Sequence, residues 1–362
     1  QGNALDEIRI SPDLLRYIIG NRKKSSSMNN RYLRTSLTSI LLLCIHLTVL
    51  QAQAITELNS GWYCKNIGEF HGSGEQLTAG NFTDITEWMP AVVPGTVLTT
   101  LLQNKKVPDP FFGTNNESIE DIYDIGRDHY TYWFYNEFSI KNIEKNDQFW
   151  LKFRGINYSA EVFLNGKKIN PKTHFGMFLR QSYQATELVK KGINRLAVLV
   201  HPADPVGNPN RGQGGDGVIA KNVMHQYVAG WDWIQPVRDR NTGIWDKVWL
   251  EQTGSIDISN PHVVTLVPGD RLPGKDQAPA TIQVSVELKN ASPKIANGVL
   301  QTDLEGQASG MDVQLMPFEK KVVSLPDIKV DHPKLWWPNG YGEQTLYDLK
   351  IKFTEGKTIS DA

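Results

Sequence analysis

Cysteine is scarce in this sequence of 362 residues, which contains only Cys44 and Cys64. Cys44 lies in an N-terminal segment that we expect to be removed, so Cys64 would remain alone. No intramolecular disulfide is therefore expected. A body of this length can be stabilised by its hydrophobic core instead.

An excess of positive charge is also missing. Lys and Arg number 38, Asp and Glu number 39, and the net charge is −1. This balance argues against the proteins that hold nucleic acid on a basic surface.

Motifs for metal, nucleophile and cofactor chemistry are missing as well. The eight His are scattered without metal-ligand spacing, and no nucleophile elbow of the form G-x-S-x-G occurs. Residues 208–217 are rich in glycine but lack the spacing of a phosphate-binding loop, so we expect a flexible surface loop and no cofactor.

The sequence has no apolar run long enough to cross a bilayer. The longest, residues 37–50, falls short of the roughly 20 residues that a membrane-spanning helix needs. It follows a short basic stretch that begins at Met28, and it precedes Ala52-Gln53-Ala54. This order is typical of a secretory signal peptide over residues 28–54. We expect cleavage after Ala54, a secreted or periplasmic protein, and upstream translated sequence in residues 1–27.

Short alternating strands dominate what remains. Phe149, Leu151 and Phe153 alternate with other residues at the period of a β-strand, and Asn165-Gly166 marks a two-residue hairpin. Helical spacing is confined to residues 96–103. The sequence pattern changes near residue 254, which we take as the boundary between two domains. An alternating strand that follows this boundary is expected to break at Asn260-Pro261. The sequence predicts an all-β protein, with a jelly-roll sandwich over 55–253 and an immunoglobulin-like sandwich over 254–362.

The most informative motif is Gly230-Trp231-Asp232-Trp233. Indole rings stack on the C–H faces of sugars, and a carboxylate accepts hydrogen bonds from sugar hydroxyls, so the motif suits carbohydrate binding. The alternative is two core tryptophans beside a turn aspartate, and composition alone favours that alternative because tryptophan is usually buried.

Arg238-Asp239-Arg240 follows closely and leads to Gly243-Ile244-Trp245. One interpretation is that an arginine holds a ligand or aligns Asp232. The other is an ion-paired turn on the surface. The residues alone do not separate these two possibilities.

Several stretches together resemble the N-terminal part of glycoside hydrolase family 2, in its β-mannosidase and exo-β-glucosaminidase branch. They are WMPAVVPGT at 88–96, DPFFGTN at 109–115, YWFY at 132–135, FRGINY at 153–158, VFLNG at 162–166, GWDW at 230–233, GIW at 243–245 and LWWPNG at 335–340. The resemblance covers roughly residues 57–355.

This resemblance implies a galactose-binding-like jelly roll, an immunoglobulin-like domain and then a (β/α)₈ barrel that carries two catalytic glutamates. The resemblance places this barrel after the residues of this sequence, so the chain is expected to lack the catalytic residues and to have the C-terminal barrel as its partner. The resemblance also implies that Asp232 binds a β-linked sugar, with Trp231 and Trp233 as walls or supports. Ile234-Gln235-Pro236 resembles the glucosaminidase-type members more than the mannosidases.

Two classes of function remain open. The chain is either the front portion of an exported exo-β-glycosidase or a free-standing carbohydrate-binding protein without catalysis. An immunoglobulin-like domain that ends before its last strand is expected to favour the first class.

Overall fold

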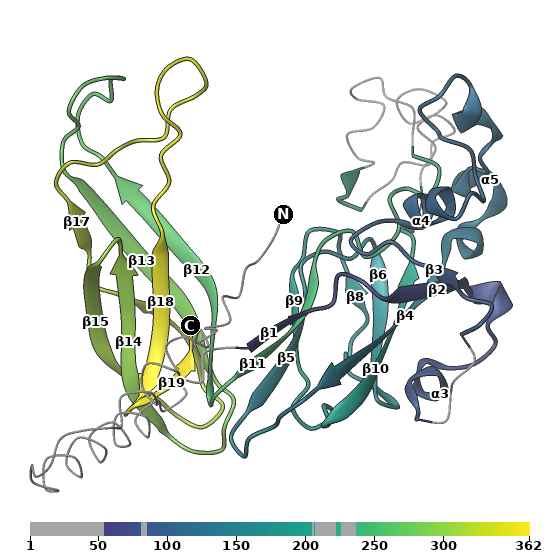
Figure 1. The fold of residues 1–362 in the computed structure, drawn as a ribbon, viewed down its shortest axis with the longest axis horizontal. Helices are drawn as coiled ribbons and strands as arrows, with labels where there is room; N and C mark the ends of the chain where they lie inside the picture. Colours follow the sequence, from purple (N-terminus) through teal and green to yellow (C-terminus); the bar gives the residue numbers. More distant parts are fainter. Residues whose placement is uncertain (1–53, 81–84, 205, 207–221, 226–236) are drawn as a thin grey trace, which may run out of the picture. The chain divides into compact units, whose positions relative to one another are not determined.

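The computed structural model describes residues 54–80, 85–204, 206, 222–225 and 237–362. In this part of the chain the fold is all-β, and four antiparallel sheets form two sandwiches in succession (Figure 1). The predicted fold class, a jelly-roll sandwich followed by an immunoglobulin-like sandwich, is confirmed. No helix in the described ranges is both long and apolar enough to cross a membrane.

The first sandwich has a four-stranded and a seven-stranded sheet. The smaller sheet has the order β1 (Ala54–Glu57), β11 (Val248–Thr253), β5 (Gln148–Phe153), β9 (Gln181–Gln184). The larger has the order β3 (Met89–Pro90), β2 (Trp62–Asn66), β4 (Tyr132–Ile140), β10 (Gly192–His201), β6 (Ser159–Leu164), β7 (Lys167–Lys168), with β8 (His174–Phe175) also paired to β6.

Strand β4 is buried on both of its faces, which explains its run of four aromatic residues. Phe134 and Phe138 point into the core between the two sheets. Trp133 and Tyr135 pack on the opposite face, in a second apolar cluster that includes Trp88. The sheet is therefore covered on both sides, and burial of these large rings supplies much of the hydrophobic stabilisation.

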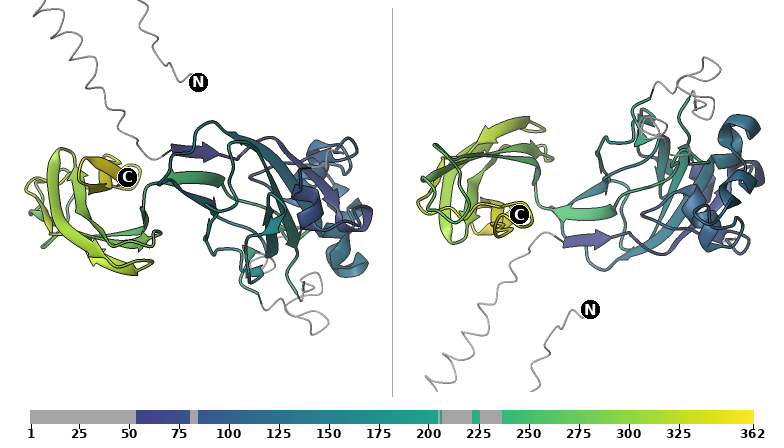
Figure 2. Two further views of the ribbon diagram at one scale, coloured as in Figure 1. Left: turned by 90° about the horizontal axis from the view of Figure 1, so that it is seen from below. Right: turned by 90° about the horizontal axis from the view of Figure 1, so that it is seen from above.

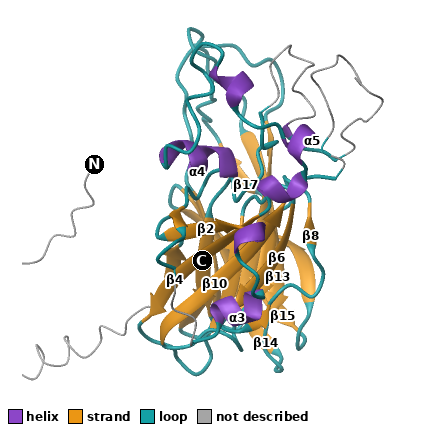
Figure 3. Ribbon diagram, turned by 90° about the vertical axis from the view of Figure 1, so that its right-hand side faces the viewer, coloured by secondary structure: helices purple, strands orange, loops and turns teal. Residues whose placement is uncertain are grey.

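Short helices and turns connect the strands. They are η1 (Ile67–Glu69), α3 (Gly74–Thr78), α4 (Val97–Gln103), η2 (Asn115–Ser118), α5 (Ile122–Ile125) and η3 (Arg127–Tyr130). The predicted helix over 96–103 is confirmed as α4. Its capping residue is Thr96, which exchanges hydrogen bonds with Thr99 in a capping box. Helices α4 and α5 lie at one end of the first sandwich (Figure 3).

The predicted hairpin is also confirmed. Strands β6 and β7 pair across Asn165 and Gly166, whose φ angles are 49° and 87°. Positive φ at both central residues is what a type I′ turn requires, and it matches the twist of the flanking strands.

The second sandwich packs two four-stranded sheets around an aliphatic core (Figure 2). One has β12 (Ile256–Leu266), β13 (Ala280–Asn290) and β16 (Lys320–Ser324), with β17 (Ile328–Val330) also paired to β13. The other has the order β15 (Gln307–Leu315), β14 (Ala296–Leu304), β18 (Leu349–Glu355), β19 (Thr358–Asp361).

The predicted break at Asn260-Pro261 is wrong, because β12 runs through both residues. The register with β13 shifts between Ser259 and His262, and Asn260 has a φ of 50°. A β-bulge therefore absorbs the proline, which has no N–H to contribute to the ladder, and pairing resumes beyond it.

Candidate functional site

The predicted sugar-binding residues Trp231, Asp232 and Trp233 lie outside the described residues. The structure does describe residues 222–225 before them and 237–245 after them. We call residues 237–245 the anchor segment. The contacts of this segment define the described part of the candidate site, and the predicted motif precedes the segment in the sequence.

The anchor segment is held by a buried carboxylate, Asp121. Arg240 makes a bidentate contact with it, with its two terminal nitrogens at 3.0 and 2.8 Å from the two oxygens. Arg238 adds a third hydrogen bond at 3.1 Å. Asp121 and Arg240 are 3% and 1% exposed, so this network is among the most buried polar clusters of the described residues. Removing one partner from such a cluster leaves an uncompensated buried charge.

This geometry corrects the prediction for Arg238-Asp239-Arg240. The interpretation as an ion-paired turn on the surface is wrong, because all three residues are buried. An arginine that holds a ligand does not fit either, since both guanidinium groups bind Asp121. Alignment of Asp232 by an arginine stays a prediction, because Asp232 lies outside the described residues. The missing information was Asp121 itself, which lies 119 residues from Arg240 in the sequence.

Asp239 connects the anchor segment to helix α4. Its carboxylate accepts hydrogen bonds from the backbone N–H of Leu98 at 2.7 Å and of Asn241 at 2.8 Å. Leu98 is in the first turn of α4, where unpaired N–H groups favour a negative charge. Complete burial nevertheless dominates and raises the pKa of Asp239 to about 6.

Asn157 fixes the anchor segment from the other side. Its side-chain amide donates to the carbonyl oxygens of Arg240 and Asn241, both at 2.8 Å. The backbones of Asn157 and Gly243 also exchange two hydrogen bonds. A Cβ on Gly243 would lie 2.6 Å from the carbonyl oxygen of Gly95, so only glycine fits this approach. The segment is thus clamped to the strands and to the start of α4.

Three aromatic rings come together beside these anchored ends. Phe178, His225 and Trp245 have ring centroids 5.5 to 5.9 Å apart. Phe178 is 48% exposed, while the Trp245 indole donates to the carbonyl oxygen of Met177 at 3.0 Å. His225 directly precedes the stretch that contains Trp231. A half-exposed aromatic platform of this kind suits the apolar face of a sugar ring.

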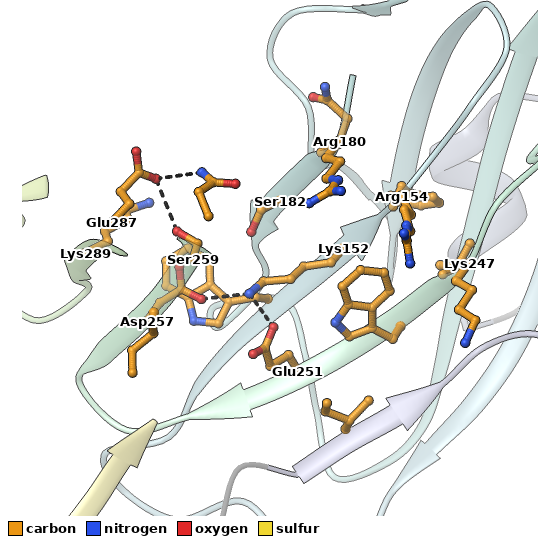
Figure 4. A pocket seen from close by; sticks show the side chains of 18 of the residues that line it. Lys152, Arg154, Arg180, Ser182, Lys247, Glu251, Asp257, Ser259, Glu287 and Lys289 are labelled. Atoms are coloured by element: carbon orange, nitrogen blue, oxygen red, sulfur yellow. Dashed lines mark hydrogen bonds and ion pairs between the residues drawn. The ribbon is translucent and has the colours of Figure 1, made fainter. Parts of the chain in front are cut away.

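One group of carboxylates among the described residues has the spacing of a metal site. Glu251, Asp257 and Asp361 bring one oxygen each within 4.8 Å of one another. The ammonium of Lys152 already forms ion pairs with two of the three, Glu251 and Asp257 (Figure 4). Burial alone would lower the pKa of Lys152, but the two carboxylates outweigh it and the pKa is raised.

Sequence reasoning missed Asp121 and Phe178 altogether, and it assigned Asn157 no role. For Asp121 a weak signal exists, because an aspartate before Ile122 is a typical helix cap, and it does accept from the N–H of Tyr123. Phe178 has no signal of its own, since only the fold brings it to Trp245.

The first sandwich has the architecture of a jelly roll, and it carries the aromatic platform. A model of the glycosyl hydrolase 2 galactose-binding domain-like family matches residues 74–246, and a model of glycosyl hydrolases family 2 matches residues 271–362. Together the two models cover well over half of the chain. The chain therefore belongs to glycoside hydrolase family 2 and consists of its N-terminal domains.

Characterised relatives are glycoside hydrolases. A mannosylglycoprotein endo-beta-mannosidase of Lilium longiflorum is 45% identical over 310 residues, which are 81% of this chain and 32% of the relative. An exo-beta-D-glucosaminidase of Streptomyces avermitilis is 28% identical over 281 residues, which are 76% and 28%. The chain thus spans about a third of the length of these relatives and corresponds to their N-terminal portion.

Solved structures agree on the fold. The exo-chitosanase CsxA of Amycolatopsis orientalis superposes with a TM-score of 0.69 at 24% identity, over 85% of this chain and 33% of CsxA. A β-D-mannosidase of Dictyoglomus thermophilum gives a TM-score of 0.59 at 23% identity, over 85% and 35%.

Proposed function

We propose that this chain is the non-catalytic N-terminal portion of an exported, retaining β-glycosidase, of the exo-β-mannosidase or exo-β-glucosaminidase type. Its jelly roll shapes the sugar subsite, and the two catalytic glutamates belong to a barrel domain outside this chain. The ligand is a β-linked oligosaccharide or glycoside, bound by Asp232 with Trp231 and Trp233 beside it.

The observation that carries the proposal is the clamping of the anchor segment. Buried bonds to Asp121 and Asn157 fix residue 237 onward, only five residues after Asp232. A binding loop on rigid supports keeps its side chains in position for the ligand. Arg238 and Arg240 are buried against Asp121, so neither is assigned to the sugar in this proposal.

The test is Asp232→Asn in the full-length parent, which keeps the side-chain shape and removes the charge. We expect kcat/KM to fall about 10- to 100-fold, because a hydrogen bond to a charged group contributes about 1.5–3 kcal/mol. A glucosaminide should lose more than a neutral mannoside, since its ammonium group interacts with the carboxylate. Unchanged kcat/KM on every substrate, in a variant that folds normally, would make Asp232 a turn residue.

The comparison with the lily enzyme favours a second substrate type. Its identity of 45% exceeds the 28% of the glucosaminidase, and its name specifies endo-cleavage of a mannosyl glycoprotein. Product analysis of the parent separates the types, because an exo-enzyme releases a monosaccharide and an endo-enzyme releases an oligosaccharide.

A free-standing carbohydrate-binding protein is the alternative from a different class, and the half-exposed platform of Phe178 and Trp245 is compatible with it. Reading the DNA downstream of Ala362 separates the two. An open frame that encodes a βα barrel supports the glycosidase, and an immediate stop supports the binding protein.

Export is part of the proposal. Strand β1 begins at Ala54 and pairs with β11 from there onward. Cleavage after Ala54 would therefore leave almost all of β1 in the mature protein. Mass spectrometry should find Ile55 as the mature N-terminus, and a cytoplasmic protein that retains residues 28–54 would contradict export.

A further inference from the structure

A pocket lies where the two sandwiches adjoin. It has a volume of about 770 Å³. Strands β1, β5, β9 and β11 of the first sandwich supply one part of its lining, and β12, β13 and β16 of the second supply the rest. The size is that of a pocket for a small organic molecule rather than for a single ion.

Cations outnumber acids in the lining. The cations are Lys152, Arg154, Arg180, Lys247, Lys289 and Lys320, and the acids are Glu57, Glu251, Asp257 and Glu287. Figure 4 shows Arg154, Arg180 and Lys247 on one side of the pocket and Glu287 with Lys289 on the other. Lys152 extends between the two sides.

Three of these cations already have carboxylate partners. Lys152 pairs with Glu251 and Asp257 at the floor of the pocket. Arg154 pairs with Asp246 at 3.2 Å, and Lys320 pairs with Glu287 at 2.8 Å. These pairs account for most of the acids that line the pocket, so they leave little negative charge for the other cations.

Arg180, Lys247 and Lys289 make no ion pair with any residue that the structure describes. The ammonium of Lys289 lies 4.5 Å from the ring centroid of Trp150 instead. Burial is the main cause that lowers the pKa of Lys289, and the nearby charge of Lys320 lowers it further. A bound anion would offset both causes.

The neutral part of the lining is rich in hydrogen-bonding groups. The side chains are Asn59, Gln181, Ser182, Ser259 and Asn260, and the half-buried indole of Trp249 accompanies them. Amides and hydroxyls suit the hydroxyl groups of a saccharide, and an indole suits its C–H face. A bare inorganic anion would use neither feature.

We propose that this junction pocket binds an oxyanion-bearing saccharide, with its carboxylate or sulfate held by Arg180 and Lys247 and its ring against the polar lining. Arg offers a planar fork of donors that matches an oxyanion, and Lys adds a point charge. Asp232 is not among the residues that line this pocket, and the proposal does not depend on the function proposed above.

The test is isothermal titration of the chain with three sugars: glucuronic acid, glucose 6-sulfate and glucose. We expect saturable binding of at least one acidic sugar and none of neutral glucose. Comparison of the two acidic sugars identifies the preferred oxyanion. Raising the salt concentration from about 0.01 M to about 0.1 M should weaken binding, because the cations are near solvent.

The variant Arg180→Gln/Lys247→Gln should bind the acidic sugar at least about tenfold more weakly, because it loses two charged donors. Both side chains are exposed, so the fold should persist. The matched control is Lys167→Gln/Lys190→Gln, which removes two exposed charges that do not line the pocket. Equal weakening in both variants, no binding of either acidic sugar, or equal affinity for inorganic sulfate would overturn the proposal.

Discussion

Asp121 is the residue on which the anchor segment depends most. It accepts hydrogen bonds from Arg238 and Arg240 and also caps helix α5. Asp121→Asn would leave two buried guanidinium groups without their counter-charge. We expect the free energy of unfolding to fall by about 3–5 kcal/mol.

Chemical denaturation of the variant measures this loss directly. The matched control is Asp124→Asn, since Asp124 lies on the same helix but is exposed and forms no ion pair among the described residues. The control should change stability by less than about 0.5 kcal/mol. A similar small effect for both variants would show that the buried network contributes little.

Asp361 predicts a pH dependence of stability. Burial, with help from the carboxylates of Glu251 and Asp257, raises its pKa to about 7. The folded state therefore keeps the proton that the unfolded state releases near pH 4. The contribution to stability is fully present below about pH 4 and is lost as the pH rises to about 7, by up to about 4 kcal/mol. Lys152 opposes the shift but does not cancel it.

The measurement is the unfolding free energy of the wild type and of Asp361→Asn between about pH 4 and pH 8. Their difference isolates one group from the other residues that titrate in this range. We expect the unfolding free energy of the variant to increase relative to that of the wild type as the pH rises. Asp348→Asn, which removes an exposed carboxylate, should run parallel to the wild type, and a parallel course for Asp361→Asn would contradict the account.

At the scale of elements, the close approach between the anchor segment and the start of α4 requires Gly243. Its φ is 152°, and an added Cβ would lie 2.7 Å from the Cα of Thr96. The Cα of Thr96 and the carbonyl oxygen of Gly95, the two nearest atoms, both belong to the backbone, so the two backbones would have to separate. Gly243→Ala should cost about 1–3 kcal/mol from overpacking, beyond its backbone strain.

The control for this prediction is Gly113→Ala. Gly113 also has a positive φ, of 56°, but an added Cβ would have nothing within 4 Å. An alanine at position 113 would therefore be strained by its φ angle but would not clash with a neighbouring atom. The melting temperature of Gly243→Ala should be well below that of Gly113→Ala. Equal melting temperatures would show that the close approach relaxes easily.

Elements that depend on local chemistry were predictable from the sequence. Asn165-Gly166 specifies its turn through two positive φ angles, and the apolar spacing over residues 96–103 predicted α4. The bulge at Asn260 was not predictable, because the pairing partner β13 decides whether the strand resumes. The fold class followed from the many alternating strands, which require no knowledge of their partners.

The candidate site was predictable only in part, since its supports are long-range. The contact between Asp121 and Arg240 and the one between Asn157 and Asn241 join segments 119 and 84 residues apart. No local pattern marks such pairs, so neither interpretation of Arg238-Asp239-Arg240 included the buried partner Asp121. Trp231, Asp232 and Trp233 stay predictions, because they lie outside the described residues.

At the scale of the whole molecule, the two sandwiches are proposed to support chemistry that another part of the parent carries out. The chain matches family 2 models over both sandwiches but spans about a third of its relatives. The first sandwich supplies the aromatic platform and the clamped anchor segment, while the catalytic carboxylates are proposed to lie in the remaining part of the parent.

The most direct test of this claim is an assay of the purified chain with nitrophenyl β-mannoside and nitrophenyl β-glucosaminide. We expect no release of nitrophenolate above the buffer rate, because hydrolysis with retention needs two positioned carboxylates that this chain is proposed to lack. Hydrolysis of either substrate by the chain alone, in proportion to its concentration, would contradict the account.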